Sequence, residues 1–428
     1  MNINQIHNCF LECDFVTTDT RKISENAMFF ALKGDNFNGN KFAQEALEKG
    51  AKYAVVDEPE FIDQPNTIFV QNVLKTLQSL ATFHRDYLGL KILALTGSNG
   101  KTTTKELINA VLSKKYNTTA TIGNLNNHIG VPLTLLSMTK HTEIGIVEMG
   151  ANHQKEIEFL CSIAKPDFGY ITNFGKAHLE GFGGVEGVIK GKTEMYRHLI
   201  NHNKHIFINT DDPIQVEKTI NAKTIAFGSQ KNSNETTIDF LDADPFVSIE
   251  FKNTVIHSNL IGNYNFGNIS AAIAIGNYFG VPINDIKSAI EAYIPANNRS
   301  QIITKGNVKI ILDAYNANPT SMSAALHNFN NQNHQNKVVI LGDMFELGNE
   351  APAEHEAIKN LVESMSFHKM ILIGENFYET KNNNSTIDFY KSFSDFKEAA
   401  DTSNFKNSLI LIKGSRGMAL ERVLDLWD

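Results

Sequence analysis

The residues best suited to chemistry lie in the segment KILALTGSNGKTTTK, residues 91–105. The apolar run Ile92–Leu95 predicts a buried strand, a glycine-rich loop follows, and a helix is expected to start at Lys101. Such a junction aims backbone N–H groups and the positive end of a helix dipole at one point, where an anion is favoured. Lys101 adds a charge for β- and γ-phosphates, and the Thr102 hydroxyl can bind Mg²⁺. The predicted phosphate-binding residues are Gly97, Ser98, Asn99, Gly100, Lys101, Thr102 and Thr103.

This loop is a compact variant of the P-loop, GSNGKT, because Leu95 stands where the strict pattern has glycine. An ordinary strand–turn–helix junction is the alternative. It would not require two glycines, a lysine and a threonine together after an apolar strand.

The elements that must position this loop repeat along the chain. At 428 residues the chain is too long for one core, and from Lys91 onwards apolar runs alternate with helical patterns. Such alternation predicts mainly parallel sheets covered by helices. We expect three α/β domains, at residues 1–85, 86–298 and 299–428, with a hinge at Pro295–Arg299 and a closing helix at 418–427. The expected strands after residue 90 are Ile92–Thr96, Ile144–Glu148, Gly169–Thr172, His205–Asn209, Thr224–Phe227, Val308–Leu312, Val338–Leu341, Met370–Ile373 and Leu409–Ile412, with an antiparallel excursion at 236–259.

Composition excludes several classes of protein. The net charge of −8 argues against sequence-independent binding of nucleic acid, which needs a basic surface. No apolar run is long enough to span a bilayer, and the first residues lack the pattern of a signal peptide. The three cysteines form no metal-type cluster with nearby histidines and are expected to be reduced. A cytoplasmic monomer is the expectation.

Further polar residues follow the expected strands, where open α/β sheets bind their ligands. Glu148 is well placed to hold Mg²⁺ directly or through water. His178 could be a metal ligand, a phosphate contact or a proton carrier, although a lone histidine is more often structural. Lys190 and Lys192 open a helical pattern, where they oppose the dipole unless an anion is bound; a solvated face is the alternative.

A second set of polar residues lies later in the chain. Asn265 and Asn268 precede an alanine-rich helix and suit either an adenine edge or helix capping. Across the expected hinge, Arg299 could reach a γ-phosphate as a mobile cation. Polar groups after three C-terminal strands predict a second site that faces the phosphate loop; they lie in DAYNANP (313–319), LGDMFELG (341–348) and KGSR (413–416).

Together these segments resemble the Mur ligase family of peptidoglycan synthesis, and the resemblance covers essentially the whole chain. The phosphate loop, GNLNNHIGVPLTLL (123–136) and EMGANHQKEI (148–157) resemble segments of the family's central domain. DAYNANP and LGDMFELG resemble the branch that adds D-alanyl-D-alanine, and KGSRGMALE (413–421) resembles its C-terminal segment. TDTRKISENAMFFALKGDNFNGNKF (18–42) resembles the uridine-nucleotide-binding N-terminal domain.

The resemblance implies an ATP-dependent ligase that uses Mg²⁺, with two ions expected, and takes UDP-MurNAc-tripeptide and D-Ala-D-Ala as substrates. Lys101, Lys192, His178 and Arg299 would be catalytic; Thr102, Glu148, His178 and Lys192, the last in carbamylated form, would hold the metal. Asn265 and Asn268 would contact adenine, Asp313 the ribose and Arg299 the γ-phosphate. The substrate-binding residues would be Thr20, Arg21, Lys33, Asn38, Asn127, Asn316, Asn318 and Arg416.

Two positions depart from the family's pattern: Tyr264 stands in place of histidine and Asn298 in place of glycine. Neither change removes a charged group, so altered packing around adenine is expected rather than loss of activity. A sister ligase that adds another amino acid, a P-loop NTPase without ligase activity and an inactive scaffold are the alternatives. The motifs do not distinguish diaminopimelate from lysine as the third residue of the peptide.

Overall fold

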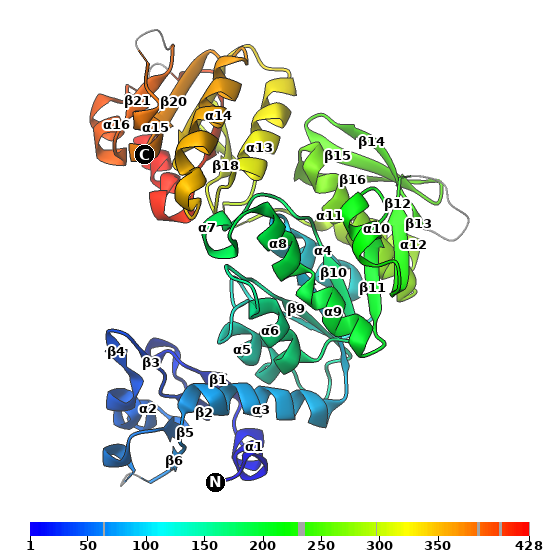
Figure 1. The fold of residues 1–428 in the computed structure, drawn as a ribbon, viewed down its shortest axis with the longest axis vertical. Coiled ribbons are helices and arrows are strands. Elements are labelled where there is room, and N and C mark those ends of the chain that lie inside the picture. The colour runs from blue at the N-terminus through cyan, green and yellow to red at the C-terminus, as the bar shows by residue number, and fades with distance from the viewer. Residues whose placement is uncertain (63–64, 230–235, 297, 383–385, 402–404, 428) are drawn as a thin grey trace.

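The computed structural model describes residues 1–62, 65–229, 236–296, 298–382, 386–401 and 405–427. Its three α/β domains follow one another along the chain, each built on its own sheet (Figure 1). The central domain lies between the N-terminal domain at the bottom of this view and the C-terminal domain at the top. The predicted three-domain α/β architecture is confirmed.

The N-terminal domain has a four-stranded parallel sheet in the order β1-β2-β5-β6. All four residues of Ala27–Phe30 are buried, as expected for a parallel strand covered on both faces. A short antiparallel β3–β4 hairpin follows β2. The elements are α1 (Ile3–Leu11), β1 (Phe15–Thr17), β2 (Ala27–Phe30), β3 (Lys33–Gly34), β4 (Phe37–Asn38), α2 (Ala43–Glu48), β5 (Ala51–Val56), β6 (Thr67–Phe69) and α3 (Val73–Leu88).

The central domain has a seven-stranded parallel sheet in the order β13-β12-β11-β10-β7-β9-β8. Strand β7, which leads into the glycine-rich loop, pairs with β9 on one side and β10 on the other. Its strands are β7 (Lys91–Thr96), β8 (Thr118–Ala120), β9 (Ile144–Glu148), β10 (Phe168–Ile171), β11 (His205–Asn209), β12 (Lys223–Gly228) and β13 (Thr236–Thr237). The helices are α4 (Lys101–Leu112), α5 (Gly130–Leu136), α6 (Glu156–Ala164), α7 (Leu179–Phe182), α8 (Val185–Lys192), α9 (Glu194–Asn201) and α10 (Pro213–Lys218).

An antiparallel three-stranded sheet completes the central domain, at the place where the alternating pattern of 236–259 predicts one. It consists of β14 (Asp239–Ala243), β15 (Phe246–Phe251) and β16 (Thr254–Ile261). The helices that follow are α11 (Phe266–Tyr278) and α12 (Ile283–Ala292). Helix α11 packs against α4, so the segment before α11 lies beside the phosphate loop.

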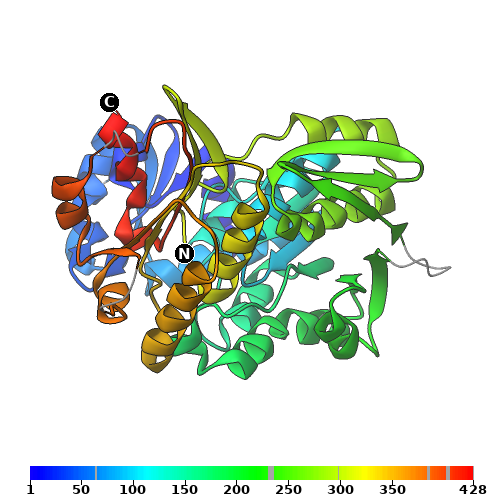
Figure 2. The same ribbon diagram turned by 90° about the horizontal axis from the view of Figure 1, so that it is seen from above.

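The C-terminal domain has a six-stranded sheet in the order β17-β18-β22-β19-β20-β21, parallel except for β17. Seen from above, its helices cover both sides of the sheet (Figure 2). The strands are β17 (Gln301–Lys305), β18 (Val308–Asp313), β19 (Lys337–Gly342), β20 (Lys369–Ile373), β21 (Asp388–Tyr390) and β22 (Leu409–Lys413). The helices are α13 (Pro319–Asn331), α14 (Ala351–Glu363), α15 (Glu375–Glu379) and α16 (Phe393–Ala399).

The end of the chain differs from the prediction of an α-helix over 418–427. Two 3₁₀ segments, Arg416–Met418 and Leu420–Trp427, flank Ala419, whose φ is +48°. The Arg422 side chain donates to the carbonyls of Met418 and Ala419, which an α-helix would use internally. Leu420 and Val423 are both buried, and their spacing of three matches the 3₁₀ repeat.

A second difference concerns Lys190 and Lys192, which the sequence places at the start of a helix. They lie in the last turn of α8, where their positive charges favour the helix dipole and do not oppose it. The other differences are small. Sequence reasoning placed the strands of the two larger sheets within two residues but did not anticipate β8, β13, β17 and β21 as sheet strands. Asn297, within the predicted hinge, lies outside the described residues. In the part of the chain that the structure describes, no helix is long and apolar enough to cross a bilayer.

Candidate functional site

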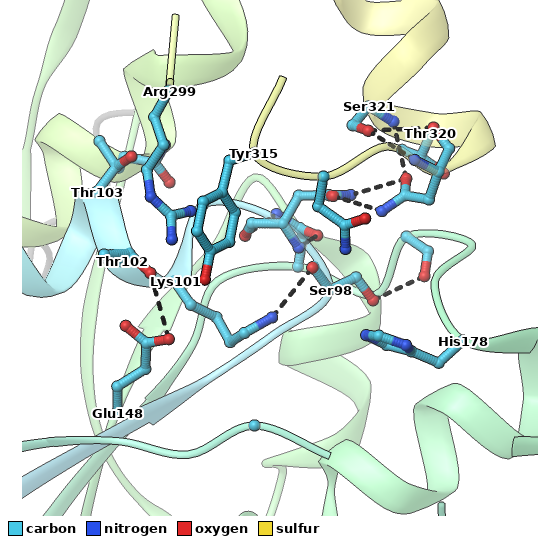
Figure 3. Close-up of a pocket in the computed structure, with 18 of the residues that line it drawn as sticks. Ser98, Lys101, Thr102, Thr103, Glu148, His178, Arg299, Tyr315, Thr320 and Ser321 are labelled. Carbon is cyan, nitrogen blue, oxygen red and sulfur yellow. Dashed lines mark hydrogen bonds between the residues drawn. The ribbon is translucent and has the colours of Figure 1, made fainter. Parts of the chain in front are cut away.

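A cavity of about 900 Å³ lies where the carboxyl ends of the central strands meet the C-terminal domain. This volume lies in the range of a small-molecule site. Many of the residues proposed from sequence line it, from both domains (Figure 3). They are Ser98, Asn99, Gly100, Lys101, Thr102, Thr103, Asn127, Glu148, His178, Asn265, Asn268, Arg299, Asp313, Asn316 and Asn318.

The glycine-rich loop is held in place by the segment after the neighbouring strand β10. Asn173 accepts the N–H groups of Ser98 and Asn99 through its carbonyl (3.0 Å) and its side-chain oxygen (3.1 Å). A side chain on Gly97 would collide with the Thr172 hydroxyl, and Gly100, at φ +77°, begins helix α4. The loop therefore needs both glycines, one for close approach and one for its backbone conformation.

The side-chain amine of Lys101 folds back onto the phosphate loop and bonds to its backbone. Its Nζ donates to the carbonyls of Gly97 (2.8 Å) and Ser98 (3.2 Å), and Figure 3 shows the bond to Ser98. Burial lowers the pKa of Lys101, the charge of Glu148 opposes this, and the charge of Arg299 adds to it. The amine is thus poised at the place where phosphate oxygens would bind.

Glu148 ends strand β9 fully buried beside the loop. Its Oε1 accepts from Asn126 Nδ2 (2.8 Å) and from the Thr102 hydroxyl (3.3 Å). Its Oε2 is buried without a hydrogen-bond partner, and the nearest cation, Lys105 Nζ, is 3.9 Å away. A buried carboxylate oxygen without a partner is costly unless a cation binds it. With the Thr102 hydroxyl, it forms a set of hard oxygen donors that suits Mg²⁺.

His178 points toward the C-terminal domain. Its Nδ1 lies in a short contact with Glu346 Oε2 of the LGDMFELG segment, and this contact lowers the pKa of Glu346. His178 has a φ of +54°, so its backbone is held in an uncommon conformation. Among the described residues no group of three His, Cys, Asp or Glu side chains is arranged to hold a metal ion.

Lys192 is fully buried but does not line the cavity. Its Nζ has no hydrogen-bond partner and lies 5.2 Å from the centre of the Phe182 ring. Burial lowers its pKa well below the usual value, and the charge of Lys101 acts in the same direction. Lys190, the competing residue in the same helix, is exposed. A buried amine whose pKa is lowered suits chemical modification better than a solvated ammonium.

The C-terminal domain contributes an unpaired cation and a paired carboxylate. The guanidinium of Arg299 lies 3.5 Å from the centre of the Tyr315 ring, and its buried Nε has no hydrogen-bond partner. Asp313 accepts from Lys413 Nζ (2.6 Å) because β18 and β22 are neighbours whose register sets these two residues opposite each other. Asn318 caps helix α13 and also donates to Asn99 in the phosphate loop (2.7 Å), which joins the two domains.

Asn265 and Asn268 lie at the start of α11 and bond to each other. Asn268 donates to Asn265 (2.7 Å) and accepts from Thr104 (2.9 Å) in helix α4. Asn265 donates to the carbonyl of Ile261 (2.8 Å). Neither side chain makes an N-cap hydrogen bond, so the alternative that these residues only cap the helix is wrong.

Besides Gly97 and Lys192, five of the proposed residues do not line the cavity. Arg416 pairs with Glu421 (2.7 Å) and does not line the cavity. The four N-terminal residues lie in a 3₁₀ segment at 20–22 and in the β3–β4 hairpin of their own domain, and none of them lines the cavity. Lys33 pairs with Asp57 (3.0 Å), and Arg21 pairs with Asp19 (2.9 Å). The four are Thr20, Arg21, Lys33 and Asn38.

Sequence reasoning gave no role to several residues that shape the cavity. Asn126 donates to Glu148, but in the run Asn-Asn at 126–127 nothing in the sequence distinguishes it from Asn127, whose side-chain oxygen accepts the N–H groups of Ile129 and Gly130 instead. Tyr315 stacks on Arg299, and Lys413 pairs with Asp313. Their position directly after strands was the available signal.

Comparison with known proteins identifies all three domains. Family models match residues 12–85 ("Mur ligase family, catalytic domain"), 95–276 ("Mur ligase middle domain") and 298–416 ("Mur ligase, glutamate ligase domain"). Two solved structures superpose on nearly the whole chain. MurF from Acinetobacter baumannii has a TM-score of 0.86 at 29% identity, covering 100% of this chain and 98% of that one. MurF from Thermotoga maritima in complex with ADP has a TM-score of 0.81 at 26% identity, covering 98% and 97%.

Curated relatives agree with these structures. The UDP-N-acetylmuramoyl-tripeptide–D-alanyl-D-alanine ligase of Bacillus subtilis is 33% identical over 96% of this chain and 92% of its own length. The ligase of the same name from Escherichia coli is 31% identical over 96% and 93%. With this identity over nearly full length, a shared fold and the site described above, the chain belongs to the Mur ligase family.

Proposed function

We propose that this protein is an ATP-dependent ligase that joins D-alanyl-D-alanine to UDP-N-acetylmuramoyl-tripeptide and releases ADP and phosphate. The observation that carries the proposal is the cavity itself. It sets a phosphate loop, a buried carboxylate oxygen without a partner and an unpaired arginine against one another, across two domains. The names of the relatives supply the substrates, and the ADP complex of the Thermotoga maritima relative supports the nucleotide.

The proposed reaction activates a carboxylate. Transfer of the γ-phosphate of ATP to the terminal carboxylate of the tripeptide gives an acyl phosphate, which the amine of the dipeptide attacks; the tetrahedral intermediate then expels phosphate. Lys101 and the loop N–H groups bind the β- and γ-phosphates, and Arg299 stabilises the charge of the transferred group. An acyl phosphate hydrolyses in water, so a site covered by a second domain protects it.

Thr102 and Glu148 are proposed to hold Mg²⁺, with His178 and Lys192 at a second ion. The ion neutralises phosphate charge when it is bound. The unpartnered Oε2 of Glu148 supports the first site. For the second, the support is the buried, unpartnered amine of Lys192, which as a carbamate would become an anion. Isotope-edited infrared or ¹³C NMR spectra recorded with ¹³CO₂ would detect the carbamate; its absence in active enzyme would refute the modification.

The remaining assignments follow the resemblance. We propose domain limits at 1–85, 86–298 and 299–428, with UDP bound by Thr20, Arg21, Lys33 and Asn38. Asn265 and Asn268 are assigned to adenine, Asp313 to ribose, and Asn127, Asn316, Asn318 and Arg416 to the peptide substrates. Asn316 and Asn318 line the cavity, which supports this placement, whereas Arg416 would have to leave Glu421.

We also propose that the enzyme acts as a cytoplasmic monomer, since UDP-linked precursors and ATP are cytoplasmic metabolites. In this role it would serve peptidoglycan synthesis and, through it, cell shape and division. Size-exclusion chromatography with light scattering would test the monomer; a stable dimer would contradict it.

Phosphate release tests the function directly. The protein is supplied with Mg²⁺-ATP, UDP-MurNAc-tripeptide and D-Ala-D-Ala, and each component is omitted in turn. Release that needs all three, with UDP-MurNAc-pentapeptide in the mass spectrum, supports the proposal. Release without the dipeptide would indicate a plain ATPase, and release with a single amino acid would indicate a sister ligase. Tripeptides ending in diaminopimelate or lysine would then define the natural substrate.

A further inference from the structure

The backbone on both sides of Arg299 is held in an uncommon conformation. Asn298 and Ser300 have φ angles of +58° and +51°, in the left-handed region that costs energy for residues other than glycine. Neighbouring groups fix both residues. The backbone N–H of Tyr315 donates to the carbonyl of Asn298 (3.2 Å), and the N–H of Ser300 donates to the carboxylate of Asp313 (3.1 Å). Strand β18 and the loop after it therefore set the direction in which Arg299 leaves the chain.

The side chain of Arg299 is supported without being neutralised. No carboxylate of the described chain lies within ion-pair distance of it, whereas the Tyr315 ring lies 3.5 Å from its guanidinium carbon. A ring face attracts a guanidinium and leaves its N–H groups free along the edge. The guanidinium points toward Lys101 and the phosphate loop, and both side chains line the same cavity (Figure 3).

The two positions that depart from the family's motifs lie in this same surrounding. Asn298 takes the left-handed conformation where the pattern has glycine, and asparagine tolerates that region better than most residues. The hydroxyl of Tyr264, where the pattern has histidine, lies 3.1 Å from the hydroxyl of Ser300. Tyr264 and Asn298 therefore influence the backbone conformation around Arg299 as well as the adenine side of the cavity.

We propose that Tyr315 is a positioning residue, whose ring holds the guanidinium of Arg299 over the phosphate loop before the nucleotide binds. The Tyr264–Ser300 hydrogen bond and the left-handed Asn298 fix the backbone for this purpose. The inference rests on the proposed function, in which Arg299 acts on the γ-phosphate. A donor already in place needs no rearrangement when charge develops, so its loss should lower turnover more than it weakens nucleotide binding.

A double-mutant cycle tests this proposal. Tyr315→Leu removes the ring face, Tyr315→Phe keeps it, and both are also made in an Arg299→Ala background. The measurements are kcat, KM for ATP, and the ratio of Kd for ADP to Kd for a non-hydrolysable ATP analogue. We expect Tyr315→Leu to lower kcat about tenfold and this ratio less, about threefold. Tyr315→Phe should stay within about threefold of the natural protein, and neither change should matter once Arg299 is absent.

Several outcomes would overturn the proposal. Equal losses in the phenylalanine and leucine variants would show that the hydroxyl, and not the ring face, is what matters. A further loss in the Arg299→Ala background would mean that Tyr315 acts independently of Arg299. Tyr264→Phe, which removes only the bond to Ser300, provides a second variant should Tyr315→Leu not fold, and should lower kcat about threefold. If the natural protein makes no pentapeptide but the affinity ratios behave as expected, the proposed reaction fails and the positioning role stands.

Discussion

The cavity and the N-terminal domain differ in whether their buried polar side chains have hydrogen-bond partners. Within the described chain, Glu148 and Arg299, which line the cavity, and Lys192, which does not, each have a buried polar atom with no hydrogen-bond partner. Among residues 1–62 and 65–88 no buried side-chain atom lacks a partner. There, Asp57 accepts from Asn40 (2.9 Å), the backbone of Val73 (3.2 Å) and Lys33 (3.0 Å).

This difference indicates which buried polar groups serve ligand binding and which serve the stability of the fold. A buried polar group without a partner lowers stability and is retained where a ligand will satisfy it. Glu421 has such an atom too, but its other oxygen pairs with Arg416. The remaining atoms of this kind in the described chain are uncharged hydroxyls, those of Thr96, Tyr196, Ser270 and Ser408. We therefore expect changes around the cavity to affect activity with little loss of stability, and changes to the satisfied, buried groups of the N-terminal domain to do the reverse.

The largest effect is expected for Glu148→Gln. The amide cannot hold Mg²⁺ as the carboxylate would, so ligation should fall about a thousandfold or more. Because the change also removes a buried charge, the melting temperature should stay the same or rise. Ligation assays and calorimetry on the same preparation provide the measurement. A clear drop in melting temperature would contradict the expectation that changes around the cavity leave stability intact.

Arg299→Ala should come next. The guanidinium has no carboxylate partner among the described residues, so its loss leaves no carboxylate unpaired, and ADP should bind almost as before. Turnover should fall about a hundredfold, because the positive charge near the transferred phosphate is gone. Steady-state kinetics and ADP titration test both parts. Unchanged turnover would remove Arg299 from the mechanism.

The hydrogen-bonded pair of His7 and His84 should make the free energy of unfolding depend on pH. His7 Nε2 and His84 Nδ1 lie 3.0 Å apart, and His84 Nε2 contacts the carbonyl of Met138 (2.9 Å) in the central domain. Burial, with the neighbouring His84, lowers the pKa of His7 from 6.5 to about 4. The unfolded chain therefore binds the proton more readily between pH 6.5 and 4, so stability should fall as pH falls through this window.

The loss should be on the order of 2 kcal/mol. Denaturant unfolding at pH 7 and pH 5 measures it, and His7→Phe should be less sensitive to pH over this range. If the variant keeps the full pH dependence, other groups are responsible.

The smallest effect is expected at the N-terminal surface. Lys33→Ala should raise KM for the UDP-linked substrate about tenfold while KM for ATP stays the same, because the ATP cavity is remote from it. Lys33 is half-exposed, so stability should change little. Lys52→Ala, which breaks a similar surface pair with Glu12 (3.0 Å), serves as the matched control. A change in KM for ATP would contradict this separation of roles.

Several features could be predicted from sequence because their causes are local. The phosphate loop is contiguous, and its two glycines and Lys101 carry the signal within a few residues. Apolar strands such as Ile144–Glu148 are buried on both faces, so their continuous apolar sequence predicts them well. Short edge strands such as Asp388–Tyr390 carry too few residues to show a pattern, and the 3₁₀ end of the chain depends on the side chain of Arg422.

The sequence by itself determined the order of the three domains, the phosphate loop and the polar residues that follow each strand. Only the tertiary structure decided which of those residues meet. Strand order sets Glu148 beside Lys101, the β18–β22 register sets Asp313 against Lys413, and domain packing sets Arg299 over the loop. These are contacts between distant segments, and local patterns cannot encode them because they depend on how the sheets and domains pack.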